Sequence, residues 1–191
     1  MSENTTTAAR TTTARTVDRG KLDVQALVLL AVLLAAGFIL NFTVGRMISS
    51  ISGGLISPEF IISAFCLTIL VVRPNVGQAL IIGLISAAVI QLTTTSPFVD
   101  FAAEGIAAML MAVIVRAGME TPAKRVIPLV GSFVTTAVSG VIFMLIRIAM
   151  VGAASELVAA MLPVVLLTAV FNAILVSALY LPIRKALGLS D

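Results

Sequence analysis

The sequence contains no histidine and only one cysteine among its 191 residues, and charged residues make up just 11% of it. The absence of histidine excludes imidazole acid–base catalysis and imidazole metal sites. The single cysteine, Cys66, excludes an intrachain disulfide and a thiolate metal cluster. Because Cys66 lies in an apolar run, we expect it to act as a small hydrophobic residue. The sequence also lacks a Gly-rich loop ending in Gly-Lys-Ser or Gly-Lys-Thr, so ATP hydrolysis by that route is excluded.

Apolar residues are abundant, whereas charged residues are scarce. Hydrophobic residues make up 60% of the chain, and the mean hydropathy is +1.17. A soluble domain carries about a quarter charged residues, so this composition predicts one compact domain inside a bilayer. The calculated pI of 9.6 would also suit a nucleic-acid partner. However, the basic residues flank apolar segments, which favours membrane orientation over nucleic-acid binding.

The first 22 residues differ from the rest of the chain. The stretch from Thr5 to Thr16 is mostly Thr, Ala and Arg and has no apolar periodicity. We therefore predict a disordered, Thr-rich cytoplasmic tail over residues 1–22, with a transit peptide as the alternative. The remaining residues, 23–191, are predicted to form a single membrane domain.

Six long apolar runs follow, separated by short polar breaks. A helix needs about 20 apolar residues to cross the hydrocarbon, with a range of about 17 to 25. The pattern therefore predicts an all-α integral membrane protein with six transmembrane helices. The predicted spans are Val24 to Val44, Ile56 to Val72, Val76 to Leu92, Phe101 to Val115, Val126 to Val151 and Leu157 to Leu181.

The basic residues predict how these spans are oriented. If both termini are cytoplasmic, only Arg46 and Arg147 of the 12 basic residues lie on the outer side. Such an asymmetry is typical of multi-pass proteins of the cell membrane. The other 10 lie on the cytoplasmic side: Arg10, Arg15, Arg19, Lys21, Arg73, Arg116, Lys124, Arg125, Arg184 and Lys185.

Several polar residues lie at or near the predicted outer ends of the spans or within them. Such residues are costly in a membrane and usually face the bundle interior, a partner or a water-filled cavity. We therefore predict a polar pocket that opens to the outside, contains both signs of charge, and suits a zwitterion or a polar heterocycle. The candidate substrate-binding residues are Asn41, Glu59, Asp100, Glu104, Arg147 and Asn172.

Some of these residues also have a structural interpretation. Glu59 and Asp100 each occur at the start of a predicted helix, where an acidic residue is favoured. Glu104 lies about one turn into its span and shares a face with Asp100. Arg147 is expected to pair with Glu104, with Glu59 or with a ligand. Asn172 lies deep in the last span, where an amide commonly forms hydrogen bonds between helices.

The first span carries two small residues, Ala31 and Ala35, that are one helical turn apart. Small residues at this spacing allow another helix to approach closely. Such small residues can also serve packing within a single chain, and the same two interpretations apply to Gly77 and Gly83 in the third span and to Gly131 and Gly140 in the fifth.

With these features, the chain resembles an S component of an energy-coupling-factor (ECF) transporter over about residues 24–187. The family's docking motif on the first helix is a pair of small residues, which Ala31 and Ala35 match. The resemblance implies a small prokaryotic plasma-membrane protein with six helices and both termini in the cytoplasm. It also implies binding of a vitamin or related micronutrient near the outer face. The implied partners are a transmembrane coupling protein and two ATPase subunits, which supply the energy.

Within that family, the chain is most similar to the branch assigned to tryptophan transport. The similar segments are Ser57-Pro58-Glu59-Phe60, Arg73-Pro74-Asn75, Leu92-Thr93-Thr94-Thr95-Ser96-Pro97 and Phe171-Asn172-Ala173. The chain departs from that branch at Phe98-Val99-Asp100-Phe101, which is shorter and more apolar than the branch's Gly-rich stretch.

We therefore expect the substrate-binding subunit of an ATP-driven importer, which uses no cofactor and is not an enzyme. The alternative is a self-sufficient secondary transporter or a small channel. That alternative needs an ion or proton path through the full membrane thickness, whereas the acidic residues stop in the outer half. A membrane enzyme is disfavoured, because the sequence offers no metal-ligand cluster and no Ser/His pair.

Overall fold

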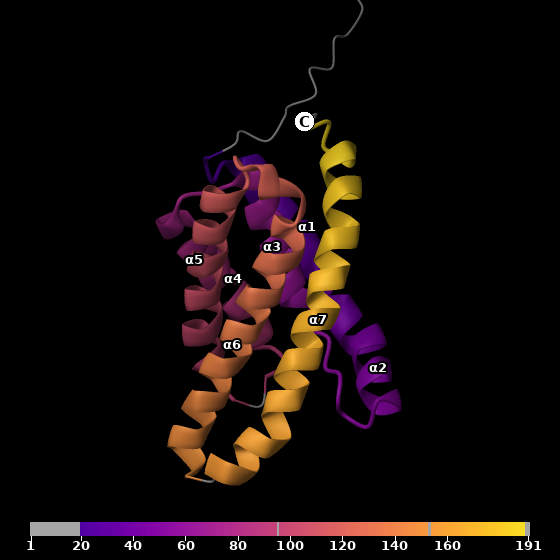
Figure 1. The fold of residues 1–191 in the computed structure, drawn as a ribbon, viewed down its shortest axis with the longest axis vertical. Helices are drawn as coiled ribbons and strands as arrows, with labels where there is room; N and C mark the ends of the chain where they lie inside the picture. Colours follow the sequence, from indigo (N-terminus) through magenta and orange to yellow (C-terminus); the bar gives the residue numbers. More distant parts are fainter. Residues whose placement is uncertain (1–19, 95, 153, 190–191) are drawn as a thin grey trace, which may run out of the picture.

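A computed structural model describes residues 20–94, 96–152 and 154–189 of the chain. Most of the predicted tail therefore lies outside the described residues. The described part is a helical bundle (Figure 1). Its elements are α1 (Val24–Leu40), the π-helix η1 (Asn41–Gly45), α2 (Arg46–Ile51), α3 (Phe60–Val72), α4 (Val76–Ile90), α5 (Val99–Gly118), the 3-10 helix η2 (Pro122–Arg125), α6 (Ile127–Val151) and α7 (Ala154–Ala186).

The prediction of an all-helical protein is confirmed, and each predicted span contains a helix. Four helical segments are long and apolar enough to cross a membrane: Val24–Ile51, Val99–Gly118, Ile127–Val151 and Ser155–Ala186. The helices α3 and α4 are apolar but have only 13 and 15 residues. At 1.5 Å per residue, each covers only about 20 Å of a hydrocarbon layer that is about 30 Å thick. The count of six spans therefore stays a prediction.

The shortness of α3 and α4 has a local cause in the turn between them. Arg73 ends α3 in the left-handed conformation, with φ of 54°, and Pro74 follows it. A left-handed residue at this position is a common way to end a helix. Asn75 then begins α4 with a capping box, in which its side chain and that of Gln78 accept each other's backbone N–H groups. These signals fix the turn and stop either helix from extending.

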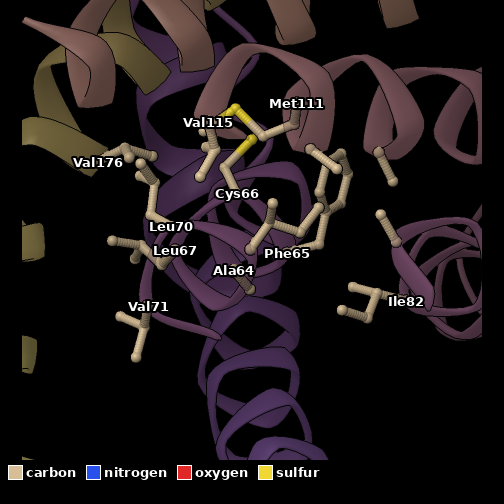
Figure 2. Packing of buried hydrophobic residues seen from close by; sticks show 14 of the residues in the cluster. Ala64, Phe65, Cys66, Leu67, Leu70, Val71, Ile82, Met111, Val115 and Val176 are labelled. Atoms are coloured by element: carbon tan, nitrogen blue, oxygen red, sulfur yellow. The ribbon is translucent and has the colours of Figure 1, made fainter. Parts of the chain in front are cut away.

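Helix α3 is the centre of the bundle. Every residue from Phe60 to Val72 is buried, and α3 packs against α1, α4, α5, α6 and α7. A helix that is apolar on all sides is expected in such a position. Figure 2 shows Cys66 pointing toward Met111 and Val115 of α5 within this core. The prediction that Cys66 acts as a small hydrophobic residue is therefore confirmed.

Two glycines allow close contacts between neighbouring helices. A Cβ atom on Gly83 of α4 would lie 2.6 Å from the backbone oxygen of Glu104 on α5. A Cβ atom on Gly140 of α6 would lie 2.8 Å from the side chain of Val165 on α7. Both distances are shorter than a van der Waals contact, so these glycines serve packing within the chain.

The bundle has two chemically different ends. The start of α1 and the C-terminal end of α7 lie at one of them, which we call the terminal end (Figure 1). The other end, which we call the cavity end, contains the C-terminal end of α6 and the start of α7 (Figure 1). Arg147 lies in the last two turns of α6, and Arg46 begins α2. Seven of the nine Lys and Arg residues in the described ranges lie toward the terminal end, which agrees with the charge asymmetry of the sequence. They are Lys21, Arg73, Arg116, Lys124, Arg125, Arg184 and Lys185.

The first helix runs further than predicted. After Leu40 it continues through the π-helical turn η1 into α2 and ends at Ile51. Helix α2 has no buried residues and projects away from the rest of the bundle (Figure 1). The turn that follows it contains Gly53 and Gly54, both with positive φ.

Candidate binding cavity

A cavity of about 380 Å³ lies at the cavity end, between residues of η1, α3, α4, α5, α6 and α7. Its volume falls within the range of small-molecule sites. We call it the acidic cavity. Its polar lining consists of Asn41, Ser57, Glu59, Thr93, Thr94, Asp100, Glu104, Thr136, Ser139 and Thr168. Its apolar lining consists of Ile62, Ile90, Gly140, Phe143, Met161, Val164 and Val165.

Three carboxyl groups face this cavity. Asp100 and Glu104 are one turn apart on α5, as predicted, and their side chains are only 6% and 3% exposed. Oε1 of Glu104 accepts a hydrogen bond of 3.0 Å from the Ser139 hydroxyl of α6. Its other oxygen, Oε2, is buried and has no hydrogen-bond partner among the residues that the structure describes. An unsatisfied buried acceptor is unusual and requires an explanation. One explanation is a ligand that donates to it.

The second carboxyl group, Asp100, is held by the turn before α5. Gln91 Nε2 donates to Asp100 Oδ2 over 3.2 Å, and Gln91 Oε1 accepts from the backbone N–H of Phe98 over 3.0 Å. Phe98 has a φ of 69° and precedes the first residue of α5. Asp100 therefore lies in the first turn of α5, as the structural interpretation expected, and also lines the cavity.

The third carboxyl group, Glu59, precedes α3, and two asparagines hold the backbone around it. Asn41 Oδ1 accepts from the backbone N–H of Phe60 over 2.9 Å. Asn172 Nδ2 donates to the backbone oxygen of Glu59 over 3.1 Å and to Thr136 Oγ1 over 3.4 Å. Asn172 is fully buried and does not line the cavity. Its observed contacts are hydrogen bonds between segments, as the structural interpretation expected, and its role in substrate binding stays a prediction.

Thr168 forms a contact with Ser57 that the sequence did not predict. Thr168 Oγ1 of α7 donates to the backbone oxygen of Ser57 over 3.0 Å and accepts from its N–H over 3.2 Å. Residues 57 and 168 are far apart in the sequence, and single hydroxyl groups in apolar helices carry no pattern that reveals such a pairing. Together with Asn41 and Asn172, Thr168 fixes the segment that carries Glu59.

Arg147 lies outside the lining of the acidic cavity. Its guanidinium donates a hydrogen bond to the Ser96 hydroxyl, and no ion pair joins it to Glu104 or Glu59 within the described residues. The predictions that Arg147 pairs with Glu104 or with Glu59 are therefore wrong. Arg147 has this different partner because the turn before α5 brings Ser96 to the end of α6, a contact that sequence spacing does not reveal.

Arg46 lies next to the cavity rather than in it. Its guanidinium lies 4.4 Å from the ring centroid of Phe42. It lines a smaller hollow of about 190 Å³ that shares Asn41, Ser57 and Glu59 with the acidic cavity. The expectation of both signs of charge is thus wrong for the acidic cavity itself, since no Lys or Arg occurs among its described lining residues.

The carboxyl groups are not arranged as a metal centre. In the described ranges, no three His, Cys, Asp or Glu residues come together as metal ligands. Carboxylates spaced around a volume of this size, facing apolar side chains such as Phe143 and Val164, suit a small organic molecule better than a bare ion.

The predicted docking residues lie on the outside of the bundle. Ala31 and Ala35 are exposed on α1, whereas Leu30 and Leu34 on the same helix are buried in the core. The small-residue face is therefore not used for packing within the described chain. Comparisons of the chain with protein-family models, with curated proteins and with solved structures found no match.

Proposed function

We propose that this chain is the substrate-binding subunit of an ECF-type importer in a prokaryotic plasma membrane. The acidic cavity would capture a small organic micronutrient, such as a vitamin-like compound or an aromatic amino acid, from the outer side. The observation that carries this proposal is a cavity of about 380 Å³ with a mixed polar and apolar lining at the end opposite most basic residues. If the basic terminal end is cytoplasmic, the cavity lies toward the outer side.

The lining narrows the chemistry of the substrate. Its charged residues are all acidic, and Glu104 Oε2 lacks a donor. A protonated amine supplies both a positive charge and hydrogen-bond donors, and charge-assisted hydrogen bonds are the stronger kind. The apolar side chains then contact the body of the molecule. A substrate carboxylate, if present, finds a cation only toward Arg46 in the adjoining hollow.

The energy would come from partner subunits. The sequence has no phosphate-binding Gly-Lys-Ser/Thr loop, so the ATPases of the ECF module would hydrolyse ATP. The exposed Ala31 and Ala35 leave room for close approach by a helix of the transmembrane coupling protein.

The alternative function, a secondary transporter or small channel, requires a polar path between the two ends. The centre of the bundle is α3, whose apolar residues from Ile69 to Val72 are all buried. This apolar core favours a binding subunit over a self-sufficient pathway.

Co-purification tests the proposed function directly. The full chain is co-expressed with a coupling protein and two ATPases of an ECF module, and the complex is isolated through a tag on the ATPase. We expect the wild-type chain to be retained. We expect Ala31→Leu/Ala35→Leu to be lost, because bulky side chains prevent close helix approach.

The matched control is Ala178→Leu, which enlarges an exposed alanine on α7 and should be retained like wild type. Uptake of the solute that co-purifies with the chain, identified by mass spectrometry, should require the ATPases. Retention of the double variant would reject the docking face. Uptake that is unchanged in cells without the ATPases would reject the importer.

A further inference from the structure

A second cavity, of about 530 Å³, lies at the terminal end of the bundle, opposite the acidic cavity. We call it the basic cavity. It lies between the turn after α3, the α5–α6 connection and the last turns of α7. Its lining contains four basic residues and no acidic residue among those the structure describes. The lining residues are Arg73, Met119, Lys124, Arg125, Pro128, Ser177, Tyr180, Leu181 and Arg184.

Two hydroxyl groups in this lining lack hydrogen-bond partners. Tyr180 is only 5% exposed, and its buried hydroxyl has no partner in the described structure. Ser177 lies three residues earlier on the same helix, and its buried Oγ also lacks a partner. Buried hydroxyl groups are normally satisfied by protein or by ordered molecules. These two residues therefore suit a ligand with several acceptor oxygens.

The charges select the same kind of ligand. Arg184 is only 7% exposed, and its guanidinium lies 5.5 Å from the Tyr180 ring centroid. Lys124 and Arg125 also line the cavity and are exposed. Arginine and lysine side chains together with hydroxyl donors are the usual ligands of a phosphate group.

The surroundings indicate where the phosphate comes from. Met119, Pro128 and Leu181 add apolar surface to the lining. The cavity lies at the end of helices that are long and apolar enough to span a membrane. Lipid headgroups are concentrated at that level of a bilayer, and basic pockets between membrane helices bind anionic headgroups. We propose that the basic cavity binds the phosphate of an anionic phospholipid.

The test measures thermal unfolding of the detergent-solubilised full chain. It is titrated with phosphatidylglycerol, with phosphatidylcholine and, in a separate arm, with inorganic phosphate. We expect phosphatidylglycerol to raise the unfolding temperature and the other two to have little effect. Lys124 and Arg125 are two of the four basic residues that line the cavity. Because charge-assisted hydrogen bonds to phosphate are the stronger kind, the double variant Lys124→Gln/Arg125→Gln should bind phosphatidylglycerol roughly 30-fold more weakly. Tyr180→Phe, which removes only the hydroxyl group, should also weaken binding.

The matched control is Lys185→Gln, which removes one exposed positive charge near the cavity without changing its lining. It should bind phosphatidylglycerol like wild type. Equal weakening in Lys185→Gln and in the double variant would mean that general surface charge is sufficient, and would overturn the site. An equal response to phosphatidylcholine would overturn the requirement for an anionic lipid. An equal response to inorganic phosphate would overturn the assignment to a lipid.

Discussion

Replacing Glu104 with Gln is the sharpest test of the acidic cavity. The substitution keeps the size of the side chain and removes its negative charge. In the structure, Oε1 of Glu104 is already bonded to Ser139, and only the buried Oε2 is without a partner. The substitution therefore removes one charge-assisted hydrogen bond between Glu104 and the ligand. Such bonds contribute about 1.5–3 kcal/mol, so we expect binding of a protonated amine to weaken roughly 10- to 100-fold.

The assay is calorimetric titration of the solubilised chain with three indoles that share one ring system. Tryptamine carries a positive charge, tryptophan is a zwitterion and indole-3-propionate is an anion. We expect tryptamine to bind most tightly to wild type and to lose most affinity in Glu104→Gln. Indole-3-propionate should bind weakest, because the described lining residues include three acidic and no basic side chains.

Two variants separate a direct contact from a general effect. Glu156→Gln removes an exposed acidic charge in the first turn of α7 and should leave tryptamine affinity unchanged. Arg147→Met should change affinity far less than Glu104→Gln, because Arg147 contacts Ser96 and does not line the cavity. Wild-type affinity for tryptamine in folded Glu104→Gln would refute the reasoning. Tighter binding of indole-3-propionate than of tryptamine would refute the assignment of a cationic substrate.

Two further predictions concern topology and packing. Cysteine placed at exposed Ser155 should react with a membrane-impermeant maleimide added to intact cells, whereas cysteine at Lys185 should react only after lysis, and the reverse pattern would invert the proposed orientation. Native Cys66 is fully buried and gives a low background. Gly83→Ala should lower the free energy of unfolding by about 1–3 kcal/mol through overpacking against α5. Gly77→Ala on the same helix, with no atom closer than 3.5 Å to its new Cβ, should not destabilise the chain; equal losses in both would reject the packing argument.

The helices could be predicted from the sequence because their signals are local. Apolar runs bounded by polar breaks coincide with α1, α3, α4, α5, α6 and α7, and Asn75 with Gln78 forms a cap that the sequence itself encodes. The length of the first helix could not be predicted, because Arg46 and the following Ser residues look like a loop. The helix continues through them by way of a π-helical turn. The central position of α3 could not be predicted either. It depends on how six apolar helices pack together, and hydropathy alone does not show which of them is the most buried.

The candidate site could be predicted only in part, for a related reason. Asp100 and Glu104 lie on one helix face, so their common orientation follows from helical spacing. The positions of Arg147 and Asn172 depend on which helices are neighbours and at what depth. The sequence indicates that a guanidinium and an amide within apolar spans need partners, but it does not indicate which ones. The structure gives them Ser96 and the backbone of Glu59, respectively.

The contacts around Glu59 divide the polar residues into two groups with different roles. Asn41, Asn172 and Thr168 use their side chains to satisfy backbone groups of residues 57–60, and so hold that segment in place. The Glu59 carboxyl group is not used for capping α3, because the helix start carries no side-chain cap bond. Neutral amides and a hydroxyl group thus hold the segment that carries Glu59, while the carboxyl groups of Glu59, Asp100 and Glu104 line the cavity. A rigid frame that leaves its charged groups available to a ligand is the arrangement that preorganised binding requires.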